Sequence, residues 1–185
     1  MVEKVRRVVI GEPESYRSEF THVEDVEALP IGETGLRWWP VWGWDELPQL
    51  PHHGSEPWTP ESFFPRAGGV RVVALGCSPE KSSASEEVQA ESLRLMTAEP
   101  AGLYHDAERA TLHRTDTVDI GVVVSGEITA EAEDGSRVTL GPGDVFVHNG
   151  ALHAEHWQPE KGGHAVIIKI GAEREGASAE REGKR

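Results

Sequence analysis

The sequence is poor in basic residues and in cysteine, and each shortage excludes a class of protein. Its 185 residues include 18 Lys and Arg against 32 Asp and Glu, which gives a formal net charge of −14. Phosphate backbones and anionic membranes are bound by clustered basic side chains, so we expect neither nucleic acid nor a membrane as partner. Cys77 is the only cysteine. No disulfide can therefore form within the chain, which favours a reducing compartment.

Long apolar runs are missing as well. The first such run, Val8–Ile10, is too short for the core of a secretory signal peptide. No apolar stretch approaches the ~20 residues that span a bilayer, so we expect a soluble, cytoplasmic protein. Hydrophobic residues make up 37% of the chain and there are 20 glycines. This composition is typical of globular proteins, and the length predicts one domain.

Tryptophan and proline are concentrated between residues 31 and 70. This segment contains Trp38, Trp39, Trp42, Trp44 and Trp58. Its frequent prolines argue against a helix and against central strands, whereas so many indoles are too much apolar area to leave in water. We expect residues 1–70 to form an irregular arm whose tryptophans pack on a sheet or on a neighbouring subunit. Two alternatives remain: one or two of the rings line a ligand pocket, or the arm docks on a partner protein.

From residue 111 onward, short strand-like runs alternate with turn residues. The runs are Val118–Val124, Glu127–Ala132, Arg137–Leu140, Asp144–Val147, Leu152–Trp157 and Ala165–Ile170. An Asp-Gly and an Asn-Gly pair stand between runs, and such pairs favour tight hairpins because glycine accepts positive φ. Short antiparallel strands without crossover helices predict an all-β sandwich or barrel. Ile120–Val124 is apolar on both faces apart from Gly121, which predicts a strand buried between two sheets.

The pattern is weaker outside this region. Val5–Ile10 and Val70–Leu75 are each typical of a strand. Ser78–Met96 has the composition of a helix, although its start is equally typical of a flexible loop. Residues 172–185 contain no large apolar side chain, so we expect a disordered tail after a barrel over residues 71–171.

Two stretches of this region carry histidine and acidic residues at a characteristic spacing. In the first, His113 is followed by Thr115, Asp119 and Gly126. This resembles the first cupin motif, which is His-x-His, three residues, Glu, six residues and Gly. The spacing is met in full, with Thr115 in place of the second histidine and Asp119 in place of glutamate.

The second stretch resembles the second cupin motif, Gly-Asp-x-x-x-x-Pro-x-Gly-x-x-His-x-x-x-Asn. Here Gly143 and Asp144 are followed by Gly150 and His153, and Trp157 stands at the position of the final asparagine. The intervening loop is one residue shorter and lacks the proline. Together the two motifs cover residues 113–157.

The resemblance implies a cupin fold, that is, a double-stranded β-helix or jelly-roll barrel, here with an N-terminal arm. The start of the chain and residues 113–119 resemble a subgroup of single-domain cupins of this size, most of which have no assigned reaction. Cupins include dioxygenases, decarboxylases, isomerases, lyases, cyclases and plain binding proteins, so the fold alone does not imply one reaction. Cupins commonly pair, and the resemblance therefore also implies a homodimer.

Strand alternation supports a metal site within that barrel. We expect the side chains of His113, Asp119 and His153 to converge from three strands on one cation. Two imidazoles and a carboxylate suit Fe(II) best, with Zn, Mn or Ni possible. Metal affinity should fall below about pH 6, because the imidazoles must be neutral to bind. The alternative is a hydrogen-bonded network of the same residues without metal.

Four further side chains are candidates for contact with substrate. Glu155 shares a strand face with His153, so we expect it to act as a supplementary ligand or as the catalytic acid or base. We expect Thr115, His148 and Trp157 to bind substrate. His148 stands at the usual proline position at the barrel mouth, and Trp157 should favour a flat apolar molecule.

These residues support two functions. The first is a metal-dependent enzyme acting on a small organic molecule such as an aromatic compound or a keto acid, by oxygenase chemistry or by Lewis-acid lyase, decarboxylase or cyclase chemistry. The second is a metal-free cupin that binds or isomerises a small ligand. The departures from the motif at Thr115 and Asp119 support this alternative.

Overall fold

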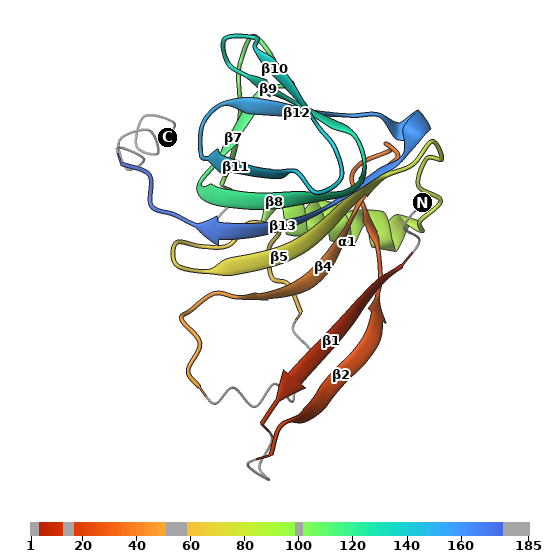
Figure 1. Ribbon diagram of the computed structural model, residues 1–185, viewed down its shortest axis with the longest axis vertical. Helices are drawn as coiled ribbons and strands as arrows, with labels where there is room; N and C mark the ends of the chain where they lie inside the picture. Colours follow the sequence, from red (N-terminus) through yellow and green to blue (C-terminus); the bar gives the residue numbers. More distant parts are fainter. Residues whose placement is uncertain (1–3, 13–16, 51–58, 99–101, 176–185) are drawn as a thin grey trace.

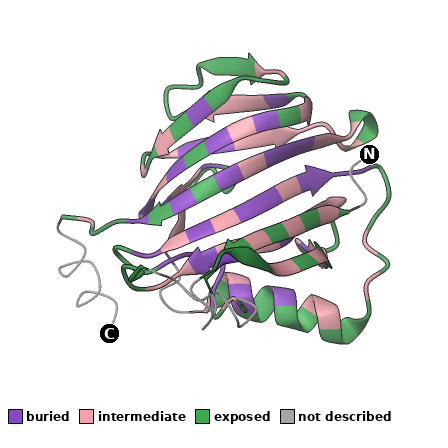
Figure 2. Ribbon diagram, turned by 60° about the horizontal axis from the view of Figure 1, so that its bottom comes forward, coloured by how far each residue is buried: buried purple, intermediate pink, exposed green. Residues whose placement is uncertain are grey.

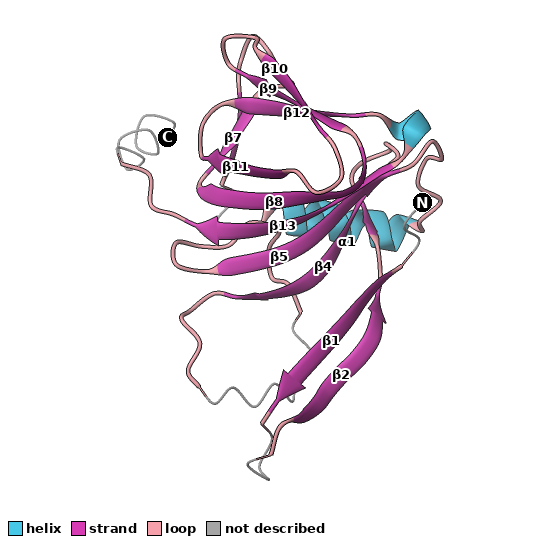
Figure 3. Cartoon of the chain, viewed as in Figure 1, coloured by secondary structure: helices cyan, strands magenta, loops and turns pink. Residues whose placement is uncertain are grey.

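The computed structural model describes residues 4–12, 17–50, 59–98 and 102–175. Most of their regular structure is antiparallel β-strand, as Figures 1 and 3 show. The predicted all-β class is therefore confirmed. None of the helices within these ranges is both long and apolar enough to cross a membrane. Trp58 and most of the predicted tail lie outside the described residues.

The described strands form two large sheets and a separate hairpin. The larger sheet has the order β11-β8-β13-β5-β4-β3. Its strands are β3 (Leu29–Pro30), β4 (Leu36–Trp44), β5 (Val70–Cys77), β8 (Thr117–Gly126), β11 (Val145–Asn149) and β13 (Gly163–Gly171). The second sheet has the order β10-β9-β12-β7-β6. Its strands are β6 (Leu103–His105), β7 (His113–Thr115), β9 (Ile128–Ala132), β10 (Arg137–Leu140) and β12 (His153–Trp157). The remaining elements are the hairpin β1 (Val5–Gly11) and β2 (Glu19–Val26), the helix α1 (Glu86–Thr97) and the 3-10 turn η1 (Pro159–Lys161).

Eight of these strands are connected as in a jelly roll. In the larger sheet β5, β13, β8 and β11 lie side by side, and in the second sheet β7, β12, β9 and β10 do so. From β10 to β13 the chain passes from one sheet to the other at each step. Two sheets of four strands joined in this way are the jelly-roll arrangement that the sequence predicts.

Glycines make this geometry possible at two kinds of position. Gly135 has φ of 83° in the turn from β9 to β10, and Gly150 has φ of 65° in the turn before β12. Inside β8, a Cβ on Gly121 would lie 2.1 Å from the ring of Phe146. The missing side chain at Gly121 therefore lets Phe146 of the neighbouring strand fill the core.

The core is centred on Trp38 of β4. This fully buried ring packs edge-on against Phe63, with ring centroids 4.8 Å apart. Its Nε1 donates to the Ser92 hydroxyl at 3.1 Å, and that hydroxyl donates to the Pro30 carbonyl at 2.6 Å. The hydrogen bonds through Ser92 thus attach α1 to the larger sheet. Leu95, one helical turn further on, is also buried in the core.

The helix falls inside the segment that was ambiguous between helix and loop. Its first residue is Glu86, because Ser85 is the N-cap and its hydroxyl accepts the Val88 N–H at 3.4 Å. The serine-rich stretch before it is not helical. Both readings of Ser78–Met96 are therefore correct for different parts of the segment.

The expectation of an irregular arm is wrong for Leu36–Trp44, which is the regular strand β4 of the larger sheet. Its proline is tolerated because the pairing with β5 shifts register between Pro40 and Trp42. Trp38 and Trp39 belong to this strand, and both are buried. Strands β1 and β2 pair as an antiparallel hairpin, which projects from the body beyond β4 (Figure 1).

The strand β8 also differs from expectation. Ile120 and Val124 are 38% and 48% exposed, although the apolar run predicts burial on both faces. Figure 2 shows this alternation of buried and less buried positions along the strands of the larger sheet. The inner face of β8 packs against the barrel core, but no described element covers its outer face.

Candidate metal centre

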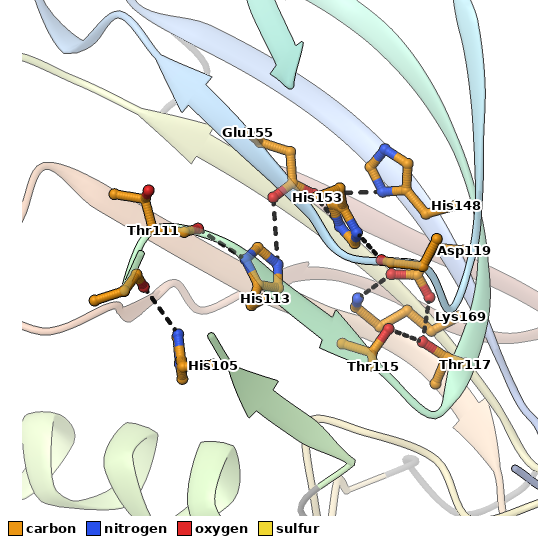
Figure 4. Close-up of polar contacts among 12 residues, drawn as sticks. His105, Thr111, His113, Thr115, Thr117, Asp119, His148, His153, Glu155 and Lys169 are labelled. Carbon is orange, nitrogen blue, oxygen red and sulfur yellow. Dashed lines mark hydrogen bonds and ion pairs between the residues drawn. The ribbon is translucent and has the colours of Figure 1, made fainter. Parts of the chain in front are cut away.

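Three histidines and one glutamate meet inside the barrel, contributed by both sheets. His113 lies on β7, and His153 and Glu155 lie on the neighbouring strand β12. His113 and His153 are direct partners in the antiparallel pairing. His148 reaches the same place from β11 of the larger sheet. Figure 4 shows the side chains converging on the Glu155 carboxylate.

The carboxylate of Glu155 is the centre of the cluster. Its Oε2 lies 3.4 Å from His113 Nε2, and its Oε1 lies 3.4 Å from His153 Nε2. The same Oε1 lies 3.5 Å from His148 Nδ1. Ligand atoms of His113, His153 and Glu155 all lie within 4.8 Å of one another. This separation is suitable for three donors around one cation.

Backbone carbonyls orient two of the imidazoles. His153 Nδ1 lies 2.7 Å from the Ala151 carbonyl, and His113 Nδ1 lies 3.4 Å from the Thr111 carbonyl. A carbonyl only accepts, so each Nδ1 carries a proton, and a neutral ring then directs its Nε2 lone pair at the cluster. The His153 ring carries a second proton, on Nε2, when it donates a hydrogen bond to Glu155. Metal-bound histidines are held in the same way by a hydrogen bond from the other ring nitrogen.

The charge on Glu155 is strongly favoured. Burial alone would raise the pKa of this carboxyl, but the hydrogen bond with His153 and the nearby imidazoles outweigh burial and lower the pKa to about 2. Glu155 is therefore ionised at neutral pH and offers an anionic oxygen at the centre of the site. An ionised carboxylate is the form that binds a metal.

The imidazoles respond differently to the same surroundings. Burial lowers the pKa of His148 to about 4 and also lowers that of His113, so both rings are neutral at pH 7. Burial acts on His153 too, but the hydrogen bond and the charge of Glu155 outweigh it and raise the pKa of His153. Among the three, His153 is the ring that takes up a proton first as the pH falls.

Asp119 is near this cluster but is engaged elsewhere. Its Oδ2 forms an ion pair of 2.5 Å with Lys169, and its Oδ1 accepts a 2.6 Å hydrogen bond from Thr117. The Thr117 hydroxyl in turn lies 2.7 Å from the Thr115 hydroxyl. The structure thus brings together His113 and His153 of the expected metal set, with Glu155 rather than Asp119 as their carboxylate neighbour.

The residues expected to bind substrate occupy three different settings. Thr115 is buried, and its hydroxyl is bonded to Thr117. Trp157 is half-buried at the end of β12 and packs against the hydrophobic core. His148 lies within the cluster itself. His156, the next histidine along β12, has the opposite orientation and its Nε2 lies 2.7 Å from Glu131.

Comparison with known proteins gives matches of limited extent. No family model matches the chain. The oryzines biosynthesis cluster protein J of Aspergillus oryzae is 44% identical over 50 residues, which are 27% of this chain and only 28% of that protein. An RmlC-like cupin from Shewanella frigidimarina has a TM-score of 0.43 and 16% identity, over 80% of this chain and 86% of the other. The polyketide cyclase RemF from Streptomyces resistomycificus has a TM-score of 0.44 and 13% identity, over 78% and 73%.

The strand order of this chain provides the decisive observation. The strands from β5 to β13 form a jelly roll, and the histidines of both sequence motifs face its interior. The chain has a cupin fold. His113 and His153 stand at positions where the cupin motifs that this chain resembles carry metal ligands. Thr115 and Asp119 stand at two other motif positions and are connected through Thr117.

Lys169 is a residue of the site that the sequence reasoning missed. It lies on the inner face of β13, where Ala165 and Ile167 are also buried. A lysine at a position that should be apolar in an alternating strand is a signal that could have indicated it. Lys169 lies directly opposite Asp119 in the pairing of β13 with β8.

Proposed function

We propose that this cupin is a metal-dependent enzyme acting on a small organic molecule, with the metal held by His113, His148, His153 and Glu155. The observation that carries the proposal is the orientation of the donors. The two Nε2 lone pairs and a carboxylate with a pKa of about 2 point to one place inside the barrel. This set of nitrogen and oxygen donors is the kind that binds Fe(II), Zn, Mn or Ni, and Fe(II) suits it best.

A buried orphan atom supports the inclusion of His148. Its Nδ1 is shielded from solvent and has no hydrogen-bond partner among the described residues. Leaving a buried polar atom without a partner costs about 1–3 kcal/mol, and coordination to a cation would remove that cost. The Glu155 oxygen at 3.5 Å shows that this nitrogen faces the same place as the other donors.

A bound divalent cation would supply Lewis-acid polarisation of a carbonyl or, as Fe(II), a site for dioxygen. The protein supplies the surroundings. His148 and His113 stay neutral, and Glu155 contributes one negative charge. We assign Glu155 to the carboxylate ligand position in place of Asp119, because its low pKa favours the ionised form that binds a metal over the protonated form of an acid. The Aspergillus relative is named for the oryzines biosynthesis cluster, which agrees with a small organic substrate.

Metal content tests the proposal. The full chain is purified without chelators, loaded with Fe(II), Mn(II), Ni(II) or Zn(II) and desalted, and the bound metal is measured by mass spectrometry. We expect about one equivalent in the wild type and a large loss in His113→Ala, His153→Ala and Glu155→Gln. His156→Ala is the matched control, because His156 is a histidine of the same strand outside the cluster.

Equally low metal in the wild type and the variants would contradict the proposal. It would favour a metal-free cupin that binds or isomerises a small ligand through the same histidines. For a protein that does hold metal, oxygen uptake in the presence of aromatic compounds and keto acids separates oxygenase from non-oxidative chemistry. Uptake that requires both Fe(II) and substrate identifies an oxygenase.

A further inference from the structure

We propose that Lys169 keeps Asp119 out of the metal coordination sphere and so determines that Glu155 is the carboxylate ligand. The inference rests on the proposed metal site. The geometry that carries it is a chain of contacts on the inner face of the larger sheet, from Lys169 through Asp119 and Thr117 to Thr115. Figure 4 shows this chain beside the histidines.

The register of β13 with β8 places Lys169 and Asp119 side by side. The two residues are opposite each other in the register of β13 and β8, and both side chains point inward. They are 5% and 4% exposed. A lysine buried at this depth needs a counter-charge, and Asp119 provides it at 2.5 Å. The faces of Phe63 and Phe64, with centroids 5.2 and 5.4 Å from Lys169 Nζ, add cation–π attraction.

Both oxygens of Asp119 are occupied by this arrangement. Lys169 takes Oδ2, and the hydroxyl of Thr117 donates to Oδ1. Thr115 extends the chain at the motif position where cupins carry a second histidine. Thr115 and Asp119, two of the four motif positions for metal ligands, are thus bonded to other side chains. His113 and His153 occupy the other two motif positions, and the cluster around them is completed by His148 and Glu155, which lie outside these positions.

Asp119 is nevertheless close enough to compete for the metal. Asp119 of β8 and His148 of β11 are direct partners in the antiparallel pairing, so the buried carboxylate lies beside one of the proposed ligands. Without the ammonium group, burial would leave Asp119 as an uncompensated anion next to a cation site, and coordination would then be favourable. Lys169 is therefore a positioning residue that acts on the metal through Asp119.

Cobalt spectroscopy of the full chain tests this inference without recourse to activity. Co(II) is added to the wild type and to Lys169→Met, Asp119→Asn and Lys169→Met/Asp119→Asn, and the visible absorption and chelator-competition affinity are measured. We expect Lys169→Met to change the spectrum and to tighten binding by about tenfold, the lower end of outer-shell effects on metal affinity. We expect Asp119→Asn and the double variant to retain the wild-type spectrum, because neither has a carboxylate at 119 to bind the metal.

The outcomes separate the two proposals. If the wild type binds no Co(II), the proposed metal site is wrong. If the wild type binds Co(II) and Lys169→Met has the same spectrum, the site stands and the positioning role of Lys169 is wrong. Should Lys169→Met not fold, Asp119→Asn decides alone: a changed spectrum means that Asp119 is already a ligand and overturns the inference, and an unchanged one supports it.

A different observation carries a second inference, that a second copy of this chain covers the outer face of the larger sheet. Six exposed side chains gather there from three adjacent strands, namely Ile120, Val124, Val145, Val147, Ile168 and Ile170. The register places them next to one another, since Ile120 pairs with both Val147 and Ile168. No charged residue interrupts this face between Val118 and Val124 of β8 or between Val166 and Ile170 of β13, because the charged Asp119 and Lys169 point inward.

The hairpin β1–β2 presents a second apolar face. Val8 pairs with Val23 and Ile10 with Phe20, and all four side chains are about half or more exposed. The opposite face of the hairpin is turned toward β4, where Arg7 lies over the Trp42 ring. The apolar face of the hairpin is thus free of the body to which the hairpin is attached.

Area and charge indicate which partner fits. From the exposed fractions, the sheet face leaves roughly 500 Å² of apolar side chain in water, at the upper end of the patches that single-chain proteins expose. The hairpin face leaves about 450 Å² more in water. A second copy that covered both faces would bury the ~800 Å² per partner that is typical of a stable protein interface. With a net charge of −14, two copies of the chain repel each other unless they meet through faces that lack charge. Two copies that meet through their outer sheet faces each contribute such an uncharged face.

The oligomeric state of the full chain tests this inference. Light scattering after size exclusion, at micromolar concentration, should give a dimer for the wild type and a monomer for Val147→Glu and Ile168→Glu. Val138→Glu is the matched control, because Val138 is 62% exposed on β10 of the other sheet. We expect this variant to remain a dimer. A monomeric wild type, or a dimer that survives both substitutions with an unchanged circular dichroism spectrum, overturns the inference. If Val147→Glu and Ile168→Glu do not fold, Val8→Glu on the hairpin replaces them.

Discussion

His148 and Glu155 lie on strands of different sheets, yet His148 Nδ1 and Glu155 Oε1 are 3.5 Å apart. The contact joins β11 of the larger sheet to β12 of the second sheet across the interior of the barrel. A cation bound here would be held by both sheets, so the site depends on how the two sheets pack. Metal binding should therefore stabilise the barrel as a whole.

The first prediction concerns this contact between the sheets. His148→Ala removes the donor that comes from β11, and we expect metal affinity to fall by at least about tenfold. The metal-induced rise in the thermal midpoint should shrink as well, because the metal no longer links the sheets. Chelator competition and thermal unfolding with and without metal provide the two measurements. An unchanged affinity, with His156→Ala as the comparison, would remove His148 from the ligand set.

Local sequence signals were sufficient to predict most of the barrel. Glycine-containing turns separate short runs, and each run from Val118 to Ile170 overlaps a strand of the structure. The motif spacing also located His113 and His153. These features depend on residues near one another in the sequence, which is why they can be recognised without knowing how distant segments pair.

The remaining features depend on long-range pairing. Lys169 faces Asp119 only because β13 pairs with β8 in one register, and the spacing of 50 residues between them carries no such information. The same holds for His148, which was expected at the barrel mouth and lies against Glu155. The frequent prolines between residues 31 and 70 were expected to exclude central strands, but a shift in the pairing of β4 with β5 accommodates Pro40.

The second prediction is a pH dependence of metal binding. Burial opposes the charged form of His153, but the Glu155 carboxylate outweighs burial and raises the pKa of this ring above its usual 6.5. As the pH falls, protons therefore compete with the metal for the His153 lone pair before they compete for those of the other two rings. Affinity should be highest above that pKa and fall as the pH drops through it. Binding isotherms between pH 5.5 and 8.5 measure the effect. Carbon-detected NMR of the metal-free imidazoles should show the His153 pKa falling in Glu155→Gln, and a constant pKa there would contradict the assigned cause.

The third prediction concerns the hydrogen bonds that attach α1 to the sheet. Ser92→Ala leaves the buried Nε1–H of Trp38 without its acceptor, and the free energy of unfolding should fall by about 1–3 kcal/mol. Leu93→Ala is the matched control on the same helix, because Leu93 is 64% exposed, and it should change stability by no more than about 0.5 kcal/mol. Urea unfolding of both variants measures the difference. Equal stabilities would show that another acceptor replaces Ser92.

The last prediction concerns His164 and stability in acid. This ring is 6% exposed, stacks edge-on against Trp39 at 5.8 Å, and has no hydrogen-bond partner at either nitrogen among the described residues. Burial lowers the pKa of His164 below 6.5.

As the pH falls below 6.5, the unfolded chain binds a proton at His164 that the native protein does not, so native stability is lost over that range. The loss per pH unit approaches about 1.4 kcal/mol for one proton. His164→Phe keeps the ring and removes the titration. The stability of the variant relative to the wild type should then be constant between pH 7 and 8 and rise steadily below pH 6.5. A difference that stays the same at every pH would mean that His164 is protonated equally in both states. Because His164 lies outside the proposed metal ligands, metal content should be the same in both proteins, and the effect on stability can be measured in metal-free samples.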